Sequence, residues 1–192
     1  MLRFAVLGSG SSGNSALVFS DHTRLLIDAG ISSKQLHLRM AQLGIAPDTL
    51  DGVLITHEHS DHTRGLEVFC RNVKKPVYCS AITRESLSCS FSNPGTWRII
   101  EGSAPFTVGD ITVTGFSVMH DAVDPMGFVF KSAGSILGFA SDLGHVTGVM
   151  QTALKGIHSL FIEANYDDVM LAAPEHGAKI CSKHLPPLES KL

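Results

Sequence analysis

The stretch THEHSDH, residues 56–62, follows directly after the apolar run Val53-Leu54-Ile55. In a chain with 10 histidines, the pattern His-x-His-x-Asp-His arises by chance in on the order of one chain in a thousand. Imidazole and carboxylate groups bind zinc and similar divalent ions, and each ion needs three or four of them at about 2 Å. We expect a loop that turns His57 and His59 toward one ion and leaves Asp61 and His62 for a second. The alternative is a polar surface loop in which the aspartate caps a helix.

Two later residues stand where a strand meets a loop, and both are candidates to complete this site. His120 ends the apolar stretch 114–119, and Asp142 ends the stretch 138–141. Either residue alone is more often an ordinary surface group. Because two ions need more ligands than residues 56–62 supply, we expect both His120 and Asp142 to bind metal.

A second motif, GSGSSGNS at residues 8–15, matches the G-x-G-x-x-G fingerprint of a dinucleotide site, with Asp28 placed where a ribose-binding acid is expected. The apolar runs at 16–19 and 24–28 argue against that site, because they predict a β-hairpin and leave too few residues for a crossover helix. A P-loop is excluded because Asn14 stands where its lysine is required. We therefore expect no nucleotide cofactor. We expect instead a tight loop facing the metal cleft, whose candidates for contact with a substrate phosphate are Ser11, Ser12 and Asn14.

The rest of the chain alternates hairpins with strand–helix units. Predicted helices cover about 33–43, 63–71, 81–88 and 146–155, and predicted strands cover 2–7, 53–55, 77–79 and 159–163. Hairpins are predicted over 97–118, around Gly109-Asp110, and over 128–140, around residues 132–135. This order predicts an α/β fold in which two mixed sheets are covered by helices.

Together, THEHSDH, His120 and the Asp142 of Ser-Asp-Leu-Gly-His resemble the metallo-β-lactamase superfamily. The stretches GSGSSGNS, LLIDAG, SDLGHVT and IEANYD narrow the resemblance to its YycJ/WalJ branch of metal-dependent, exonuclease-like hydrolases. The resemblance implies a four-layer αββα sandwich. It places His57, His59 and His120 on one metal, Asp61 and His62 on the other, and Asp142 between them. It also implies one later histidine, for which His184 in Lys-His-Leu-Pro is the first candidate and His176 the second.

The implied cofactors are two divalent metal ions, zinc or manganese. The leading hypothesis is a phosphodiesterase, an exonuclease acting on DNA rather than RNA, in which Asp61 orients a metal-bridging hydroxide for attack on phosphorus. Glu58 and Asp28 either support the ligands or play no part, and His145 either contacts substrate or lies on the surface. Two alternatives remain: hydrolysis of a small thioester or lactam, and an inactive, truncated metal-binding member.

The composition says more about the cellular compartment than about the substrate. The net charge of −3 gives no global attraction to nucleic acid, although residues 64–84 carry five basic residues against one acidic residue. The four cysteines form no C-x-x-C pair, and we expect free thiols, no signal peptide, no membrane span and a cytoplasmic location. Residues 1–171 are expected to form the hydrolase domain, and residues 172–192 a divergent or shortened end of the same domain.

Overall fold

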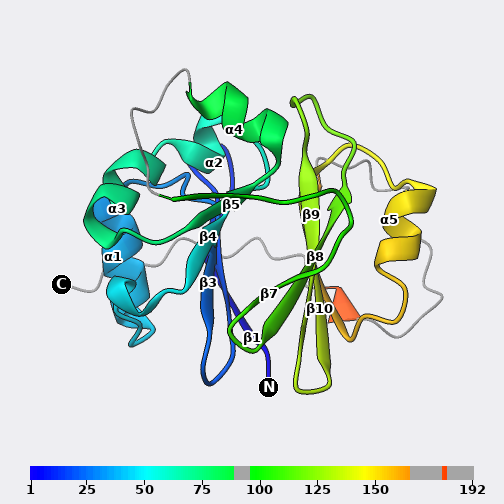
Figure 1. Ribbon diagram of the computed structural model, residues 1–192, viewed down its shortest axis with the longest axis horizontal. Coiled ribbons are helices and arrows are strands. Elements are labelled where there is room, and N and C mark those ends of the chain that lie inside the picture. Colours follow the sequence, from blue (N-terminus) through cyan, green and yellow to red (C-terminus); the bar gives the residue numbers. More distant parts are fainter. Residues whose placement is uncertain (89–95, 165–178, 181–192) are drawn as a thin grey trace.

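The computed structural model describes residues 1–88, 96–164 and 179–180. Two six-stranded sheets pack face to face, and helices cover their outer faces (Figure 1). The first sheet lies on the left of that view with α1 (Ser33–Gln42) and α3 (Leu66–Val73), and the second lies on the right with α5 (Gly148–Ala153). This arrangement confirms the predicted αββα sandwich of two mixed sheets.

The first sheet runs in sequence order from β1 to β6. Its first half is an antiparallel meander, and its second half is parallel because helices connect the strands. The strands are β1 (Arg3–Gly8), β2 (Ser15–Phe19), β3 (Arg24–Ile27), β4 (Gly52–Leu54), β5 (Val77–Cys79) and β6 (Trp97–Ile99). The remaining elements on this side are η1 (Pro47–Thr49), α2 (Ser60–Thr63) and α4 (Ala81–Ser88). The hairpin predicted after the glycine motif is β2–β3.

The second sheet has the order β12-β11-β10-β9-β8-β7. Its strands are β7 (Phe106–Val108), β8 (Ile111–Ser117), β9 (Met126–Ser132), β10 (Ser135–Leu143), β11 (Ser159–Ala164) and β12 (Lys179–Ile180). The hairpin predicted over 97–118 is wrong in its first part: residues 97–99 pair in parallel with β5 in the first sheet, and only β7 and β8 form a hairpin. Alternation of apolar residues indicates a strand but does not identify its partner. The strand β12, with two residues, is too short to give such a pattern.

The core forms three layers, because adjacent strand residues point to opposite faces of each sheet. Leu25 and Ile27 face the second sheet and pack in one cluster with Phe128 and Phe130. Leu26, which lies between them, faces the outer helices and belongs to a different cluster that contains residues of α1 and α3. A third cluster joins the outer face of the second sheet to α5. Within residues 1–88 and 96–164, no helix has the length and hydropathy needed to span a membrane.

Asp110, in the β7–β8 turn, joins the two sheets at the end of the sandwich that carries the β2–β3 turn. Its carboxylate accepts hydrogen bonds from Ser20 Oγ and Thr23 Oγ1, both at 2.6 Å, and from Ser132 Oγ at 2.9 Å. The hydrogen bond from Ser20, followed by that from Thr23, lowers the pKa of Asp110 from 3.8 to about 2.

We expect Asp110→Asn to lower the Tm by about 2–4 °C at pH 7, because the amide accepts fewer and weaker hydrogen bonds. A lowered folded-state pKa stabilises the fold above the ordinary pKa of 3.8, and that contribution is lost as the pH falls toward about 2. The difference in Tm between wild type and variant should therefore shrink from pH 4 downward in a series of thermal melts. Asp48→Asn, at an exposed position in η1, is the control. A pH-independent difference would contradict this account.

Candidate metal centre

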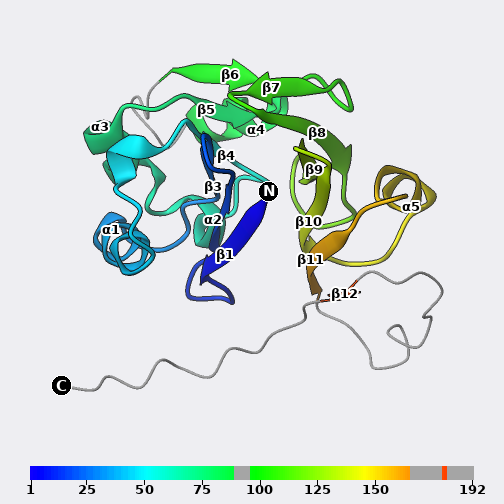
Figure 2. The same ribbon diagram turned by 90° about the horizontal axis from the view of Figure 1, so that it is seen from below.

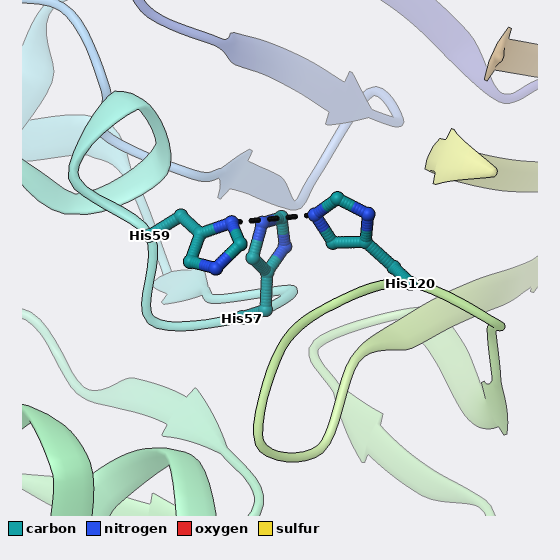
Figure 3. Close-up of side chains that lie close together, drawn as sticks. All are labelled: His57, His59 and His120. Carbon is teal, nitrogen blue, oxygen red and sulfur yellow. Dashed lines mark hydrogen bonds between the residues drawn. The ribbon is translucent and has the colours of Figure 1, made fainter. Parts of the chain in front are cut away.

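Three histidine rings from two sheets meet where the strands end (Figure 3). His57 and His59 lie in the loop after β4, and His120 lies in the loop after β8. The ring centroids of His57 and His59 are 4.7 Å apart, and the ring of His120 lies 4.9 Å from His57 and 5.1 Å from His59. The atoms His120 Nε2 and His59 Nδ1 are 3.3 Å apart. One nitrogen of each ring lies within 4.8 Å of the others, so the three can converge on one ion.

A second group of possible ligands shares His57 with the first. It consists of His57, His62 and Asp142, whose donor atoms also lie within 4.8 Å of one another. Asp142 Oδ2 is 2.6 Å from His62 Nε2 and 3.7 Å from His57 Nε2. Asp61 lies beside this group, with Oδ2 at 3.6 Å from His62 Nε2. The structure thus brings together six of the predicted ligands; His184 and the alternative His176 lie outside the described residues.

Local backbone features place the ligands of the second group. His62 lies in the single turn of α2, which begins after His59, and its N–H donates to His59 O at 2.9 Å. Asp142 has a φ of +51° at an irregularity in the pairing of β10 with β11, between Ala140 and Leu143. A strand bulge of this kind redirects a side chain that regular alternation would place elsewhere. Asp142 reaches the histidines from the second sheet through this bulge.

Asp28 and Thr56 form a buried support behind the histidines. Both follow parallel strands, and the carboxyl ends of β3 and β4 lie at the same sheet edge. Asp28 is 1% exposed and accepts hydrogen bonds from the N–H and hydroxyl of Thr56, each at 2.8 Å. Its Oδ2 also lies 2.8 Å from His62 Nδ1. Since a carboxylate can only accept, His62 Nδ1 carries a proton and donates it to Asp28, and Nε2 is the nitrogen that faces the cluster.

The electrostatics and an unpartnered atom fit the binding of a cation. Burial, followed by the charge of His62, lowers the pKa of His57 to about 4, which keeps that ring neutral at pH 7. Burial by itself lowers the pKa of His62, but the carboxylates of Asp28 and Asp142 outweigh it and raise that pKa to about 10. His57 Nε2 is buried and has no hydrogen-bond partner among the described residues. A divalent ion bound by these side chains would satisfy this nitrogen and balance the carboxylates.

Sequence comparison identifies the family of a chain with this fold and this cluster. The family model described as "Beta-lactamase superfamily domain" matches residues 23–186. The chain belongs to the β-lactamase superfamily. It is 37% identical over 172 residues to "Exodeoxyribonuclease YycJ" of Bacillus anthracis, a match that covers 88% of this chain and 65% of that protein. It is 32% identical over 190 residues to "Exodeoxyribonuclease WalJ" of Streptococcus pneumoniae, which covers 97% of this chain and 71% of that protein.

Solved structures agree with the fold of this superfamily. The metallo-β-lactamase fold protein YhfI from Bacillus subtilis superposes with a TM-score of 0.72 at 17% identity. The superposition covers 86% of this chain and 72% of that chain. At this identity the likeness shows the metallo-β-lactamase fold, which the resemblance in the sequence had implied.

The side chain of Glu58 supports the loop that carries His120. Its Oε1 accepts a hydrogen bond from Val123 N at 3.0 Å, and it lies 4.0 Å from His59 Nε2. Of the two roles left open for Glu58, the structure therefore supports contact with the ligand loops. His145 is exposed and lies beside the same loop, where it forms an isolated β-bridge with Met119.

The glycine motif lies against the cluster, but its polar side chains differ in their surroundings. Asn14 is 6% exposed, with Nδ2 at 2.9 Å from His62 Nε2 and 3.2 Å from Asp61 Oδ2. Internal contacts therefore occupy its side chain. Ser11 and Ser12 are exposed at the tip of the loop. Gly13 must be glycine here, because its φ is +137° and a Cβ would lie 2.5 Å from Gly30 O.

Some of the basic side chains in residues 64–84 make contacts within the protein. Arg64 donates to the carbonyl oxygens of Ser12 and Gly30, and Arg71 pairs with Glu67 at 3.1 Å. Arg64 therefore helps to hold the glycine loop on the metal motif.

A groove of about 820 Å³ lies next to the loop that carries His120, and the residues that line it include no candidate metal ligand. Residues of α4, β8 and α5 line it, and its wall includes Ser117, Asp124 and Met126, which flank the loop that carries His120. Met126 N donates to Thr56 O at 3.0 Å, so one wall residue is bonded to the residue that precedes His57.

Glu163, near the end of β11, lies next to the cluster but was not among the residues predicted for it. Its Oε1 accepts a hydrogen bond from Ser9 Oγ at 2.8 Å. Burial raises the pKa of Glu163, and the charges of Asp142 and Asp61 act in the same direction, while Ser9 opposes them. Glu163 comes directly after the apolar run Leu160-Phe161-Ile162, as Asp142 and His120 come at the ends of apolar runs, and this position was the available signal.

Proposed function

We propose that this chain is a dinuclear metal-dependent phosphodiesterase that shortens DNA from an end. The observation that carries the proposal is the pair of three-donor groups that share His57, because paired metal ions are typical of enzymes that cleave phosphodiester bonds. The two relatives named exodeoxyribonucleases support DNA as the substrate class. Since the chain spans 65% of the first of them, the activity of the whole relative comes to this chain only as a proposal.

In this proposal His57, His59 and His120 would hold one ion, and Asp61, His62 and Asp142 would hold the second. Zinc and manganese both suit imidazole and carboxylate ligands. When bound, two such ions would lower the pKa of water and stabilise negative charge on a phosphoryl group. Asp28 accepts a hydrogen bond from His62 Nδ1 and so directs Nε2 to the cluster, and Asp61, with Oδ2 facing the cluster, would orient the attacking water. Asn14 holds Asp61 and His62 in place.

The substrate side of the proposed site is the glycine loop together with the groove. Ser11 and Ser12 are exposed on a loop bonded to the metal motif, which suits contact with a phosphate next to the scissile bond. The DNA chain beyond that phosphate extends along the groove between α4 and α5.

We further propose that residues 1–171 form the hydrolase domain and that residues 172–192 belong to it. Pairing of β12 with β11 in one sheet supports this, as does the family match that extends to residue 186. Cys70 and Cys79 are buried free thiols, which supports the cytoplasm as the compartment.

Purified protein supplied with manganese or zinc is expected to shorten 5′-labelled single-stranded DNA progressively. Because the ions supply the electrostatic stabilisation, removal of metal with a chelator should stop the reaction, and added metal should restore it. Product ladders on a denaturing gel give the measurement, and a matched RNA strand tests the preference for DNA.

The same preparation should be assayed with a thioester and with a lactam. Hydrolysis of either of these without cleavage of nucleic acid would replace the proposed function with that of a small-molecule hydrolase. Absence of metal-dependent cleavage of DNA, RNA and a simple phosphodiester would refute it.

A further inference from the structure

A hydrogen bond between residues 154 positions apart joins the two sheets next to the metal cluster. Ser9 follows β1 in the first sheet, Glu163 lies in β11 of the second, and Ser9 Oγ donates to Glu163 Oε1 at 2.8 Å. The two strands also contact each other through Phe4 and Phe161, whose ring centroids are 5.0 Å apart. Figure 2 shows β1 beside β11 where the two sheets meet. The hydrogen bond therefore joins two strands that already pack together.

The other end of the glycine loop is bonded to the metal motif. Asn14 N donates to Asp61 O at 2.7 Å, and the Asn14 side chain contacts both His62 and Asp61. Asn14 Oδ1 in turn accepts a hydrogen bond from Gly10 N at 2.7 Å. Residues 10–13 thus lie between an anchor on the metal motif and an anchor on Glu163.

Glu163 lies next to a metal ligand but is not itself one of the candidate ligands. It neighbours the bulge of β10 that carries Asp142, because Ile162 pairs with Ala140 and Ala164 pairs with Leu143. Its side chain reaches the loop and not the donor groups of the two ligand sets, which do not include it. Burial raises the pKa of Glu163, and the hydrogen bond from Ser9 opposes that shift.

We propose that Glu163 is a positioning residue that acts through Ser9 to hold residues 10–13 as a phosphate-binding arm beside the metal ions. This inference rests on the proposed phosphodiesterase function. A loop held at both ends loses less conformational entropy when a phosphate binds to it. The effect is on substrate binding and not on the chemical step, so loss of the bond raises KM and leaves kcat nearly unchanged.

Ser9→Ala and Glu163→Ala are each expected to raise KM for short single-stranded DNA about tenfold, with kcat changed by less than about twofold. The double variant should be no worse than either single variant, because both remove the same bond. Glu163→Gln retains an oxygen that accepts from Ser9 and should restore most of the binding. Metal content should stay at the wild-type value in all four variants, and Glu101→Gln, at an exposed position, is the control.

Hydrogen exchange gives a readout that does not depend on cleavage. In the zinc-loaded protein, inorganic phosphate should slow exchange of the backbone amides of residues 9–13, and Ser9→Ala should reduce this slowing about fivefold or more. If wild type cleaves no DNA but shows this protection and its loss in Ser9→Ala, the proposed function fails and the phosphate-binding arm stands. Additive effects on KM, loss of an ion in Glu163→Gln, or equal protection in wild type and Ser9→Ala would each overturn the inference.

Discussion

Replacing His57 with alanine is expected to remove the ion assigned to His57, His59 and His120 and to lower DNA cleavage by roughly a thousandfold or more. His57 belongs to both groups of possible ligands, but the proposed assignment uses it for the first ion. Its removal leaves that ion with His59 and His120, fewer than the three protein ligands of a typical catalytic zinc site, whereas Asp61, His62 and Asp142 remain for the second ion. Metal analysis of the purified proteins, together with the DNA assay, measures both effects.

His59→Ala is the matched comparison, because it removes another ligand assigned to the same ion. Both variants should retain about one ion per chain where wild type retains about two. His22→Ala, at an exposed position in the β2–β3 turn, should leave metal content and rate unchanged. Two ions bound to His57→Ala would contradict the assignment of His57 to the first ion.

Asp28→Asn is expected to weaken metal binding and activity by about 10–100-fold while the protein stays folded. The φ of Asp28 is +57°, a conformation that asparagine tolerates, so the backbone is retained. The amide of the variant can donate to His62 Nδ1, which then accepts, and the proton moves to Nε2. A protonated Nε2 cannot bind metal. Competition with a chromophoric chelator measures the affinity, and circular dichroism checks the fold.

Two further variants separate this effect from a general loss of stability. Asp48→Asn, at an exposed position, should match wild type in both affinity and fold. Thr56→Val removes the hydroxyl that donates to Asp28 but leaves the contact of Asp28 with His62, so its loss of metal affinity should be smaller than that of Asp28→Asn. An unchanged metal affinity in Asp28→Asn would mean that the tautomer of His62 does not depend on Asp28.

Much of the fold followed from patterns within short stretches of sequence. The strand at 77–79 and the helix at 81–88 have the predicted bounds, and the β2–β3 hairpin lies where the turn residues indicated. These elements depend on the periodicity of apolar residues and on turn chemistry, which nearby residues decide. Residues 97–99 were predicted in the wrong sheet. Their parallel pairing with β5 depends on α4, which lies between the two strands in the chain and outside the strand whose pattern was considered.

The candidate site divides in the same way. Four of the proposed ligands lie within six residues, so residues 57–62 alone indicated a metal centre; their assignment to ions stays a prediction. The glycine motif shows the opposite case, since its fingerprint suggested a dinucleotide and the hairpin after it ruled that out. Its contacts with Asp61, His62 and Glu163 could not be predicted, because they join three segments that are distant in the chain.

The sequence by itself determined the chemistry of this protein: imidazole and carboxylate groups at a spacing that suits divalent ions, after a buried strand. Only the tertiary structure decided that His57 belongs to two groups of possible ligands, that an irregularity in β10 brings Asp142 close to it, and that Glu163 accepts a hydrogen bond from Ser9 of the glycine loop. The physical reason is that side-chain chemistry and local periodicity are properties of neighbouring residues. The meeting of side chains from two sheets depends instead on how those sheets pack, which no short stretch of sequence specifies.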